Sequence, residues 1–310
     1  MKTQPLGPTD VRVTRLAYGC MRIAHTWNPR DVTPDREREG IASVLAAYEA
    51  GYTFFDHADI YCAGECERIF GLALKQVPGM RDRVFIATKC GIRFPGDPNP
   101  TSPHRYDFSA EHILASCEKS LRRLGVDTID LYQLHRPDLL MNPAEVAEAF
   151  DKLRSAGKVR YFGVSNFLPS FVSLLQSALP FPLVVNQVEI HLGRLDCFYD
   201  GTLDQCLERR ITPLAWSPLG GGFLGEGGTL RDGDPRHHLL SVLDATAREY
   251  GVSRTVISLA WLLKHPSGIV PIIGTTRPER IRDAARADDI DLTREQWYRI
   301  LVAARQKPLP

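Results

Sequence analysis

Two kinds of hydrophobic pattern alternate along this chain. Short runs rich in β-branched and aromatic residues predict strands, and each run is followed by a turn and by a segment whose apolar residues recur every three or four positions, as in an amphipathic helix. The predicted strands cover residues 16–18, 54–56, 84–88, 128–133, 161–164, 184–188, 212–215 and 269–273. The predicted helices cover residues 40–50, 66–75, 110–124, 143–156, 168–177, 203–209, 241–250, 254–264 and 278–285.

Strands separated by helices predict an α/β fold. We expect a (β/α)8 TIM barrel, formed as one domain by residues 1–310, with extra helices at the C-terminal end. Residues 4–14 place Gly7 and Pro8 between polar and β-branched residues, which predicts an N-terminal β-hairpin across the bottom of the barrel. Three longer connections are either active-site loops or tolerated surface insertions, at residues 23–37, 92–109 and 219–238.

The composition fits such a barrel and argues against a nucleic-acid partner. With 310 residues, of which 44% are hydrophobic, the chain is long enough for a substantial core and short enough for one barrel. Lys and Arg number 38 against 37 Asp and Glu, and no basic stripe is interleaved with aromatic residues, so the electrostatic footprint of a nucleic-acid-binding protein is missing. We expect a small-molecule partner, and nothing in the sequence demands more than a monomer.

Neither the N-terminus nor the cysteines indicate export. The first residues have neither the apolar core nor the cleavage-like site of a signal peptide, and no apolar run approaches the roughly 18 residues of a membrane span. The seven cysteines form an odd, scattered set, which is typical of free thiols in a reducing compartment. We therefore expect a soluble, cytoplasmic protein without disulfides or a membrane partner.

Four polar residues follow three neighbouring predicted strands. FFDHADIY contains Asp56 and Tyr61, ATKCG contains Lys89, and LYQLHRP contains His135. Taken singly, Tyr61 would be a loop anchor, Lys89 an exposed strand end and His135 a core histidine. The carboxyl ends of parallel strands meet at one rim of a barrel, where active sites lie, so the set as a whole predicts catalysis.

These four residues have the chemistry of a proton donor and its supports. A phenol has an unperturbed pKa of about 10, and a nearby ammonium favours the phenolate, so Lys89 is expected to lower the pKa of Tyr61. Asp56 would supply the counter-charge that keeps a partly desolvated Lys89 protonated. His135 would orient a substrate carbonyl or pass a proton.

A metal site and a Rossmann-type site are both disfavoured. The side chains with zinc-ligand chemistry near the predicted rim are His57, Asp59, Cys62, Cys66 and His135. No His-x-His follows the first strand, no HExxH occurs, and no second Cys pair completes a tetrahedral site, so no metal is predicted. GGGFLG at residues 220–225 matches the GxGxxG spacing but leads into EGGTLRDGDP in place of a helix, so no helix N-terminus would receive a pyrophosphate.

The same four residues carry a family resemblance. They match the Asp, Tyr, Lys and His tetrad of the aldo-keto reductase superfamily, which the chain resembles along nearly its whole length. Further motifs stand in the order seen in that family: GKVRYFGVSNF at 157–167, NQVEIH at 186–191, AWSPLGGG at 215–222 and PIIGTTRPERI at 271–281. The resemblance implies an enzyme in which a reduced nicotinamide supplies a hydride, Tyr61 supplies a proton, and an aldehyde or ketone becomes an alcohol.

The resemblance also implies where the dinucleotide lies. Ser165, Asn166 and Gln187 would hydrogen-bond the nicotinamide carboxamide, and Trp216 would stack on its ring; the ordinary alternative is that the three polar residues cap neighbouring helices and strands. The residues expected at the cofactor site are Gly19, Cys20, Met21, Ser165, Asn166, Gln187, Trp216, Ser217, Leu219, Gly220, Gly274, Thr275, Thr276, Arg277 and Arg280.

The segment GTTRPERIRDA bears on the choice of cofactor. An arginine fork and a hydroxyl suit a 2′-phosphate, and Arg280 and Thr275 match the positions that contact it in the family. Gly274 and Ala284 depart from the lysine and asparagine that many members have. NADP(H) is therefore favoured, and NAD(H) stays possible if the arginines are only solvated helix charges.

Two questions stay open at this point. The rival to an enzyme is a nicotinamide-binding regulatory subunit with incidental turnover, which turnover of a simple aldehyde would exclude. The long connections carry five aromatic or histidine residues: His25, Trp27, Phe94, His104 and Phe223. These residues would either shape the substrate pocket or lie on the surface.

Overall fold

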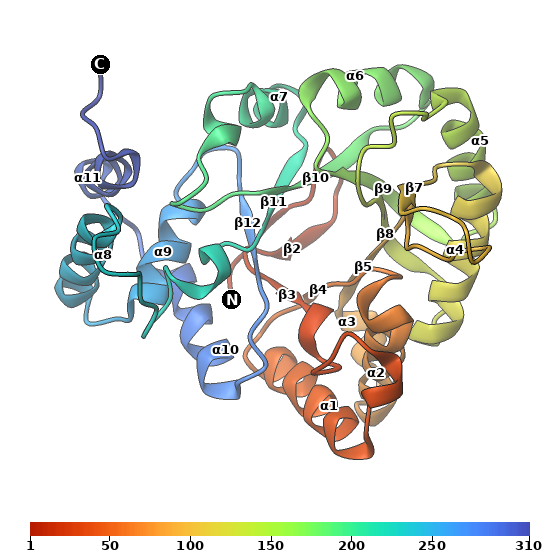
Figure 1. Ribbon diagram of the computed structural model, residues 1–310, viewed down its shortest axis with the longest axis horizontal. Coiled ribbons are helices and arrows are strands. Elements are labelled where there is room, and N and C mark those ends of the chain that lie inside the picture. Colours follow the sequence, from red (N-terminus) through yellow and green to blue (C-terminus); the bar gives the residue numbers. More distant parts are fainter.

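The computed structural model describes residues 1–310 and contains a closed parallel barrel. Neighbouring strands around the barrel are β3, β4, β5, β8, β9, β10, β11 and β12, all paired in parallel (Figure 1). Their bounds are Ala17–Gly19, Phe54–Asp56, Phe85–Cys90, Ile129–Leu134, Val159–Ser165, Leu183–Glu189, Thr212–Trp216 and Val270–Ile273. The predicted (β/α)8 barrel is confirmed.

Helices surround the barrel and follow most strands. From α1 to α11 their bounds are Pro34–Glu49, Glu65–Gln76, Met80–Arg83, Ala110–Leu124, Pro143–Ser155, Pro169–Ala178, Thr202–Arg209, His237–Tyr250, Arg254–Leu263, Pro278–Ala285 and Arg294–Arg305. The predicted start of α1 at residue 40 is wrong: Thr33 caps the helix by accepting from the amide of Arg36, and Pro34 occupies its first position. The first turn is polar, so hydrophobic periodicity does not reveal it.

No helix combines the length and apolar character that crossing a membrane requires.

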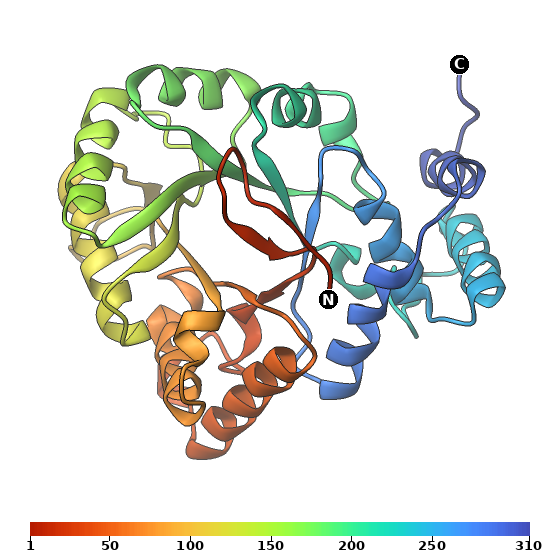
Figure 2. The same cartoon turned by 180° about the vertical axis from the view of Figure 1, so that it is seen from behind.

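The N-terminal hairpin closes one end of the barrel, as predicted. Strands β1 (Thr3–Pro5) and β2 (Arg12–Thr14) pair antiparallel, and Figure 2 shows them lying across the barrel mouth. Leu6 and Val13 are fully buried and join the cluster of apolar side chains that fills the barrel interior. This end is therefore packed shut, which leaves the carboxyl ends of the strands as the open rim.

The C-terminal helices α8 and α11 stand outside the ring of helices around the barrel (Figure 1). Helix α11 docks onto α9 through Trp261 and Trp297, whose rings stack with centroids 4.9 Å apart and 6° between their planes. Each indole nitrogen donates to the other residue's carbonyl oxygen, at 3.1 and 3.0 Å. The pair combines stacking with reciprocal hydrogen bonds, so it fixes the position of α11.

Replacing Trp297 by Phe is expected to lower the free energy of unfolding by about 1–2 kcal/mol, because the carbonyl of Trp261 loses its donor while an aromatic ring remains. Urea unfolding followed by circular dichroism measures the change. Leu140→Ala is the control, since Leu140 is 92% exposed and should change the value by less than about 0.5 kcal/mol. Equal effects of the two substitutions would contradict the role given to the tryptophan pair.

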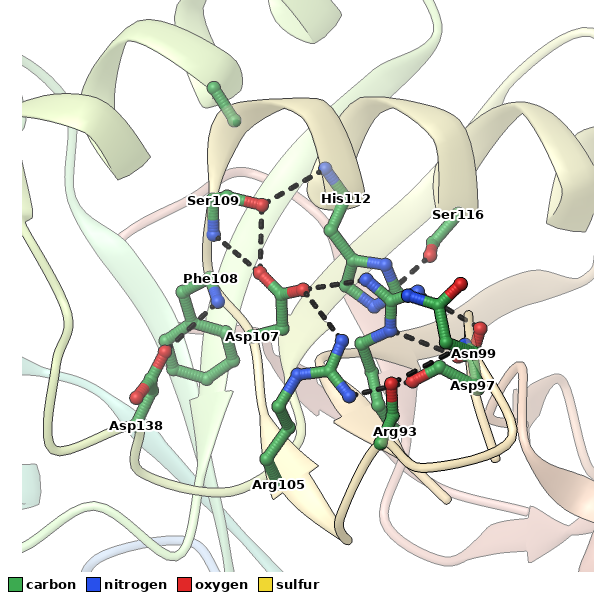
Figure 3. Close-up of polar contacts among 12 residues, drawn as sticks. Arg93, Asp97, Asn99, Arg105, Asp107, Phe108, Ser109, His112, Ser116 and Asp138 are labelled. Atoms are coloured by element: carbon green, nitrogen blue, oxygen red, sulfur yellow. Dashed lines mark hydrogen bonds and ion pairs between the residues drawn. The ribbon is translucent and has the colours of Figure 1, made fainter. Parts of the chain in front are cut away.

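The connection after β5 contains a second hairpin that the sequence pattern does not reveal. Strands β6 (Ile92–Arg93) and β7 (Arg105–Tyr106) pair antiparallel. Figure 3 shows the Arg93 guanidinium bridging two carboxylates, at 2.9 Å from Asp97 and 2.7 Å from Asp107. Nearby, the amide of Phe108 donates to Asp138 at 3.0 Å, which ties this connection to the one that follows β8.

Candidate active site

A cavity of about 1040 Å³ lies at the open rim of the barrel. Its volume is at the upper end of the range typical of small-molecule sites, roughly 300–1,000 Å³. Among the residues predicted from the sequence, those that line it are Gly19, Met21, Asp56, Tyr61, Lys89, His135, Ser165, Asn166, Gln187, Trp216, Ser217, Leu219, Gly274, Thr275, Thr276, Arg277 and Arg280.

Two predicted cofactor residues do not line this cavity. Cys20 is fully buried just after β3, so its thiol belongs to the core. Gly220 lies beside the ring of Phe223, which a Cβ on Gly220 would approach within 2.4 Å. Its neighbours Gly221 and Gly222 line the cavity in its place.

Strand periodicity explains why several polar side chains meet at the rim. Side chains alternate between the two faces of a strand, and Phe85 and Ala87 of β5 both belong to the barrel-interior cluster. Lys89 is therefore the next inward position along β5. The same rule places Asp56 two residues beyond the interior residue Phe54 on β4.

Asp56 and Lys89 form a buried ion pair. The ammonium of Lys89 lies 2.8 Å from each carboxylate oxygen of Asp56 and also donates to the carbonyl oxygen of His57. The two residues are 3% and 1% exposed, so their charges are screened little by water. Burial lowers the pKa of Lys89, and the carboxylate of Asp56 opposes that shift.

Tyr61 lies near both this ion pair and His135. The Lys89 ammonium is 5.3 Å from the centre of the Tyr61 ring, and the ring centroids of Tyr61 and His135 are 6.0 Å apart. Cys62 and Ala63, which follow Tyr61, both have positive φ angles, 48° and 52°. Two successive left-handed residues are uncommon outside glycine, so the turn that presents Tyr61 is strained.

The pKa of Tyr61 shifts in the opposite direction to the one expected from the sequence. Burial raises the pKa of Tyr61 well above its ordinary value, and the carboxylate of Asp56 raises it further. Burial therefore outweighs the lowering that a nearby ammonium would cause. Burial and the charges of Lys89 and Arg136 lower the pKa of His135 well below its ordinary value. Near neutral pH the pocket thus presents a protonated phenol and a neutral imidazole.

A chain of hydrogen bonds joins the polar residues at the ends of β9, β10 and β11. The Ser165 hydroxyl donates to the Gln187 carbonyl at 2.8 Å, and the Asn166 amide nitrogen donates to the Ser165 hydroxyl at 2.8 Å. The Trp216 indole donates to the Asn166 side-chain oxygen at 2.9 Å. The side-chain oxygen of Gln187 is buried without a partner. Ser165 and Asn166 are therefore used within the protein, while Gln187 keeps a free acceptor.

The far end of the cavity is bounded by the connection between β12 and α10. Arg277 and Arg280 are exposed there and neither forms an ion pair with a protein carboxylate. The backbone before them is held in place, because the Tyr18 hydroxyl donates to the Thr275 carbonyl at 3.2 Å. Helix α10 begins at Pro278, so its free amide groups face the same end.

The structure adds cavity residues that the sequence analysis does not single out. Arg22, Ile60 and Arg136 also line the cavity, and Ile60 and Arg136 directly adjoin in sequence two members of the tetrad Asp56, Tyr61, Lys89 and His135. The only sequence signal for Arg136 is its place directly after His135. Of the loop residues proposed to shape a substrate pocket, Trp27 lines the cavity, whereas Phe94 and His104 stack on each other with centroids 6.2 Å apart. His25 and Phe223 do not line it.

The residues with zinc-ligand chemistry are not arranged around a common point. No group of three or more His, Cys, Asp or Glu side chains is placed to hold a metal ion. His57 is fully buried, its ring packs 4.5 Å from that of Phe70, and burial lowers its pKa to about 3. All seven cysteines are buried and unpaired.

Comparison with known proteins agrees with this geometry. A sequence model of the Aldo/keto reductase family matches residues 15–303. The oxidoreductase YcsN of Bacillus subtilis is 42% identical over 303 residues, 97% of each chain, and a 6-dehydroglucose reductase of Novosphingobium aromaticivorans is 42% identical over 98% of this chain and 96% of its own. The solved structure of the glycerol dehydrogenase AKR11B4 from Gluconobacter oxydans matches with a TM-score of 0.86 and 26% identity, covering 99% of this chain and 97% of its own. The chain therefore belongs to the aldo/keto reductase family.

Proposed function

We propose that the protein is an NADPH-dependent oxidoreductase that reduces the carbonyl group of aldehydes or ketones to an alcohol. The observation that carries the proposal is the buried Asp56–Lys89 pair beside Tyr61 and His135 in a cavity of about 1040 Å³. Tyr61 is the proton donor, because burial keeps its phenol protonated near neutral pH. In the oxidising direction the same residues would act in reverse.

The cavity fits a nicotinamide dinucleotide. The buried side-chain oxygen of Gln187 has no protein donor and is suited to accept from a carboxamide, while the aromatic face of Trp216 offers a stacking surface. When bound, the reduced nicotinamide supplies the hydride. The protein's part is to fix the ring against Trp216 and Gln187 so that the substrate carbonyl meets it in a reactive orientation.

The remaining tetrad members act on the substrate carbonyl and on Tyr61. His135 is neutral and lines the cavity, so its imidazole can donate a hydrogen bond to the carbonyl oxygen without competing as an acid. The Lys89 ammonium, held by Asp56 and 5.3 Å from the centre of the Tyr61 ring, offers positive charge as negative charge develops on the phenol oxygen. Together these groups stabilise the charge that forms on oxygen during reduction.

The preference for NADPH rests on the unpaired arginines at the far end of the cavity. Arg280 and Arg277 have no carboxylate partner, and Thr275 adds a hydroxyl beside them. A 2′-phosphate would supply the anion that these groups lack.

Replacing Arg280 by Gln is expected to raise the Kd of NADPH about tenfold while leaving that of NADH nearly unchanged, because one charge-assisted contact to the 2′-phosphate is lost. Fluorescence titration measures both constants. Arg282→Gln is the matched control, since Arg282 lies on the same helix, is exposed and does not line the cavity. Equal weakening of both cofactors would assign Arg280 to a part that NADPH and NADH share.

Titration of the purified protein with NADPH and NADH, followed by addition of aldehydes, tests the proposed function directly. Aldehyde-dependent loss of absorbance at the reduced nicotinamide band supports the reductase. Binding without turnover across a broad panel would favour a regulatory subunit instead. Relatives at 42% and 41% identity are 6-dehydroglucose reductases, so sugar-derived aldehydes belong in the first panel.

A further inference from the structure

Arg136 occupies the tetrad end of the cavity without a protein partner. It directly follows His135 and lines the cavity, and its guanidinium carbon lies 5.4 Å from the centre of the Trp216 ring. The side chain is half-buried. It makes no hydrogen bond or ion pair with another residue, and its contact with Trp216 is with the face of the aromatic ring.

Several other partly buried arginines in this protein have carboxylate partners. Arg15 contacts Asp288 at 3.2 Å and Arg81 contacts Asp130 at 3.0 Å. A guanidinium has five donors and is expensive to remove from water without acceptors. The free donors of Arg136 therefore point to an acceptor supplied from outside the chain.

The charges around the cavity are distributed unevenly. Asp56 is the acidic residue that lines the tetrad end, and Lys89 engages both of its oxygens. The other acidic lining residues, Glu226, Glu279 and Asp283, lie on the connection after β11 or on α10. Arg136 is thus left without an opposing carboxylate where a substrate would lie, and this end attracts anions.

We propose that Arg136 is a specificity-determining residue that binds a carboxylate on the carbonyl substrate. The planar guanidinium matches the two oxygens of a carboxylate, and its contact with the Trp216 ring, 5.4 Å from the ring centre, places it at this end of the cavity. The substrate would present its carbonyl to Tyr61 and His135 and its carboxylate to Arg136. This inference rests on the proposed carbonyl reductase function and adds the chemical class of substrate, an oxo-acid.

The test compares two aldehydes of nearly the same shape, 4-carboxybenzaldehyde and 4-nitrobenzaldehyde, which differ in charge. For Arg136→Gln, the ratio of kcat/KM for the carboxylate over that for the nitro compound should fall about 10- to 100-fold relative to the wild type, because a hydrogen-bonded charge pair is lost. Arg136→Lys, which keeps the charge but not the fork, should give an intermediate ratio.

A matched control is Arg154→Gln. Arg154 also stacks on an aromatic ring, with its guanidinium 4.7 Å from the centre of Phe181, but it does not line the cavity. This variant should keep the wild-type ratio. A general loss of packing would lower kcat/KM for both aldehydes alike and leave the ratio unchanged, so the ratio separates recognition from a structural role.

Several results would overturn the inference. An unchanged ratio in Arg136→Gln, with both aldehydes still reduced, would refute the role of Arg136 and leave the reductase proposal standing. A marked rise in the Kd of NADPH in this variant, without a change in ratio, would assign Arg136 to the cofactor instead. Failure of the wild-type protein to oxidise NADPH with either aldehyde would count against the proposed function itself, and the inference would fall with it.

Discussion

Replacing Tyr61 by Phe is expected to lower kcat for carbonyl reduction by about 10²- to 10⁴-fold, the range associated with losing a positioned general acid. The substitution removes the hydroxyl and keeps the ring, so the contacts of that ring with Trp27 and His135 persist, at centroid distances of 6.3 and 6.0 Å. Steady-state kinetics with saturating NADPH and 4-nitrobenzaldehyde measure the effect.

The control for this variant is the binding of the cofactor. Because Phe fills the same space, the Kd of NADPH should change by no more than about twofold, and the thermal unfolding temperature should stay close to that of the wild type. Weakened NADPH binding of the same size as the loss in kcat would show that Tyr61 holds the dinucleotide. Near-normal kcat would show that another group, such as water, delivers the proton.

Much of this site could be predicted from the sequence because it sits on regular elements. Asp56 and Lys89 each end the inward-facing row of a strand, and β-branched and aromatic runs predict these strands, whereas the role of Gln187 is implied only by the family resemblance. Once the carboxyl ends of the strands share a rim, these side chains must meet. The prediction therefore needed only the period of two and the order of the strands.

What the sequence could not predict depends on contacts between distant segments. The hairpin within residues 92–109 is held by ion pairs of Arg93 with Asp97 and Asp107. In the sequence these charged residues are indistinguishable from those of an ordinary polar loop. The direction of the Tyr61 pKa shift depends on burial and on the nearby carboxylate of Asp56. Arg136 could not be predicted, because the absence of a partner is visible only when all of its neighbours are known.

The Asp56–Lys89 pair gives the second large expected effect. Lys89→Met should lower the free energy of unfolding by about 3–5 kcal/mol, because it leaves the carboxylate of Asp56 buried without its counter-charge. It should also reduce kcat by about 100-fold or more, since the positive charge near Tyr61 is lost. Urea unfolding and steady-state kinetics measure the two effects separately.

A double substitution separates stability from catalysis. In Lys89→Met with Asp56→Asn, the buried charge is removed as well, so most of the lost stability should return. The low kcat should not return, because neither residue then supplies charge to Tyr61. Arg160→Met is a control: Arg160 also pairs with a buried carboxylate, Asp130, but its side chain is 61% exposed, and Asp130 keeps Arg81 as a partner. We expect that control to cost less than about 1 kcal/mol.

The outcomes distinguish two roles for the same ion pair. If the double variant stays as unstable as Lys89→Met, the aliphatic stem of Lys89 or its bond to the His57 carbonyl, and not the charge of Asp56, maintains the fold here. If the double variant regains wild-type kcat, the ion pair contributes only to the stability of the barrel, and proton donation by Tyr61 does not need a nearby positive charge. Recovery of stability without recovery of kcat is the result that the geometry predicts, because Lys89 lies both in the buried pair and 5.3 Å from the ring of the proposed proton donor.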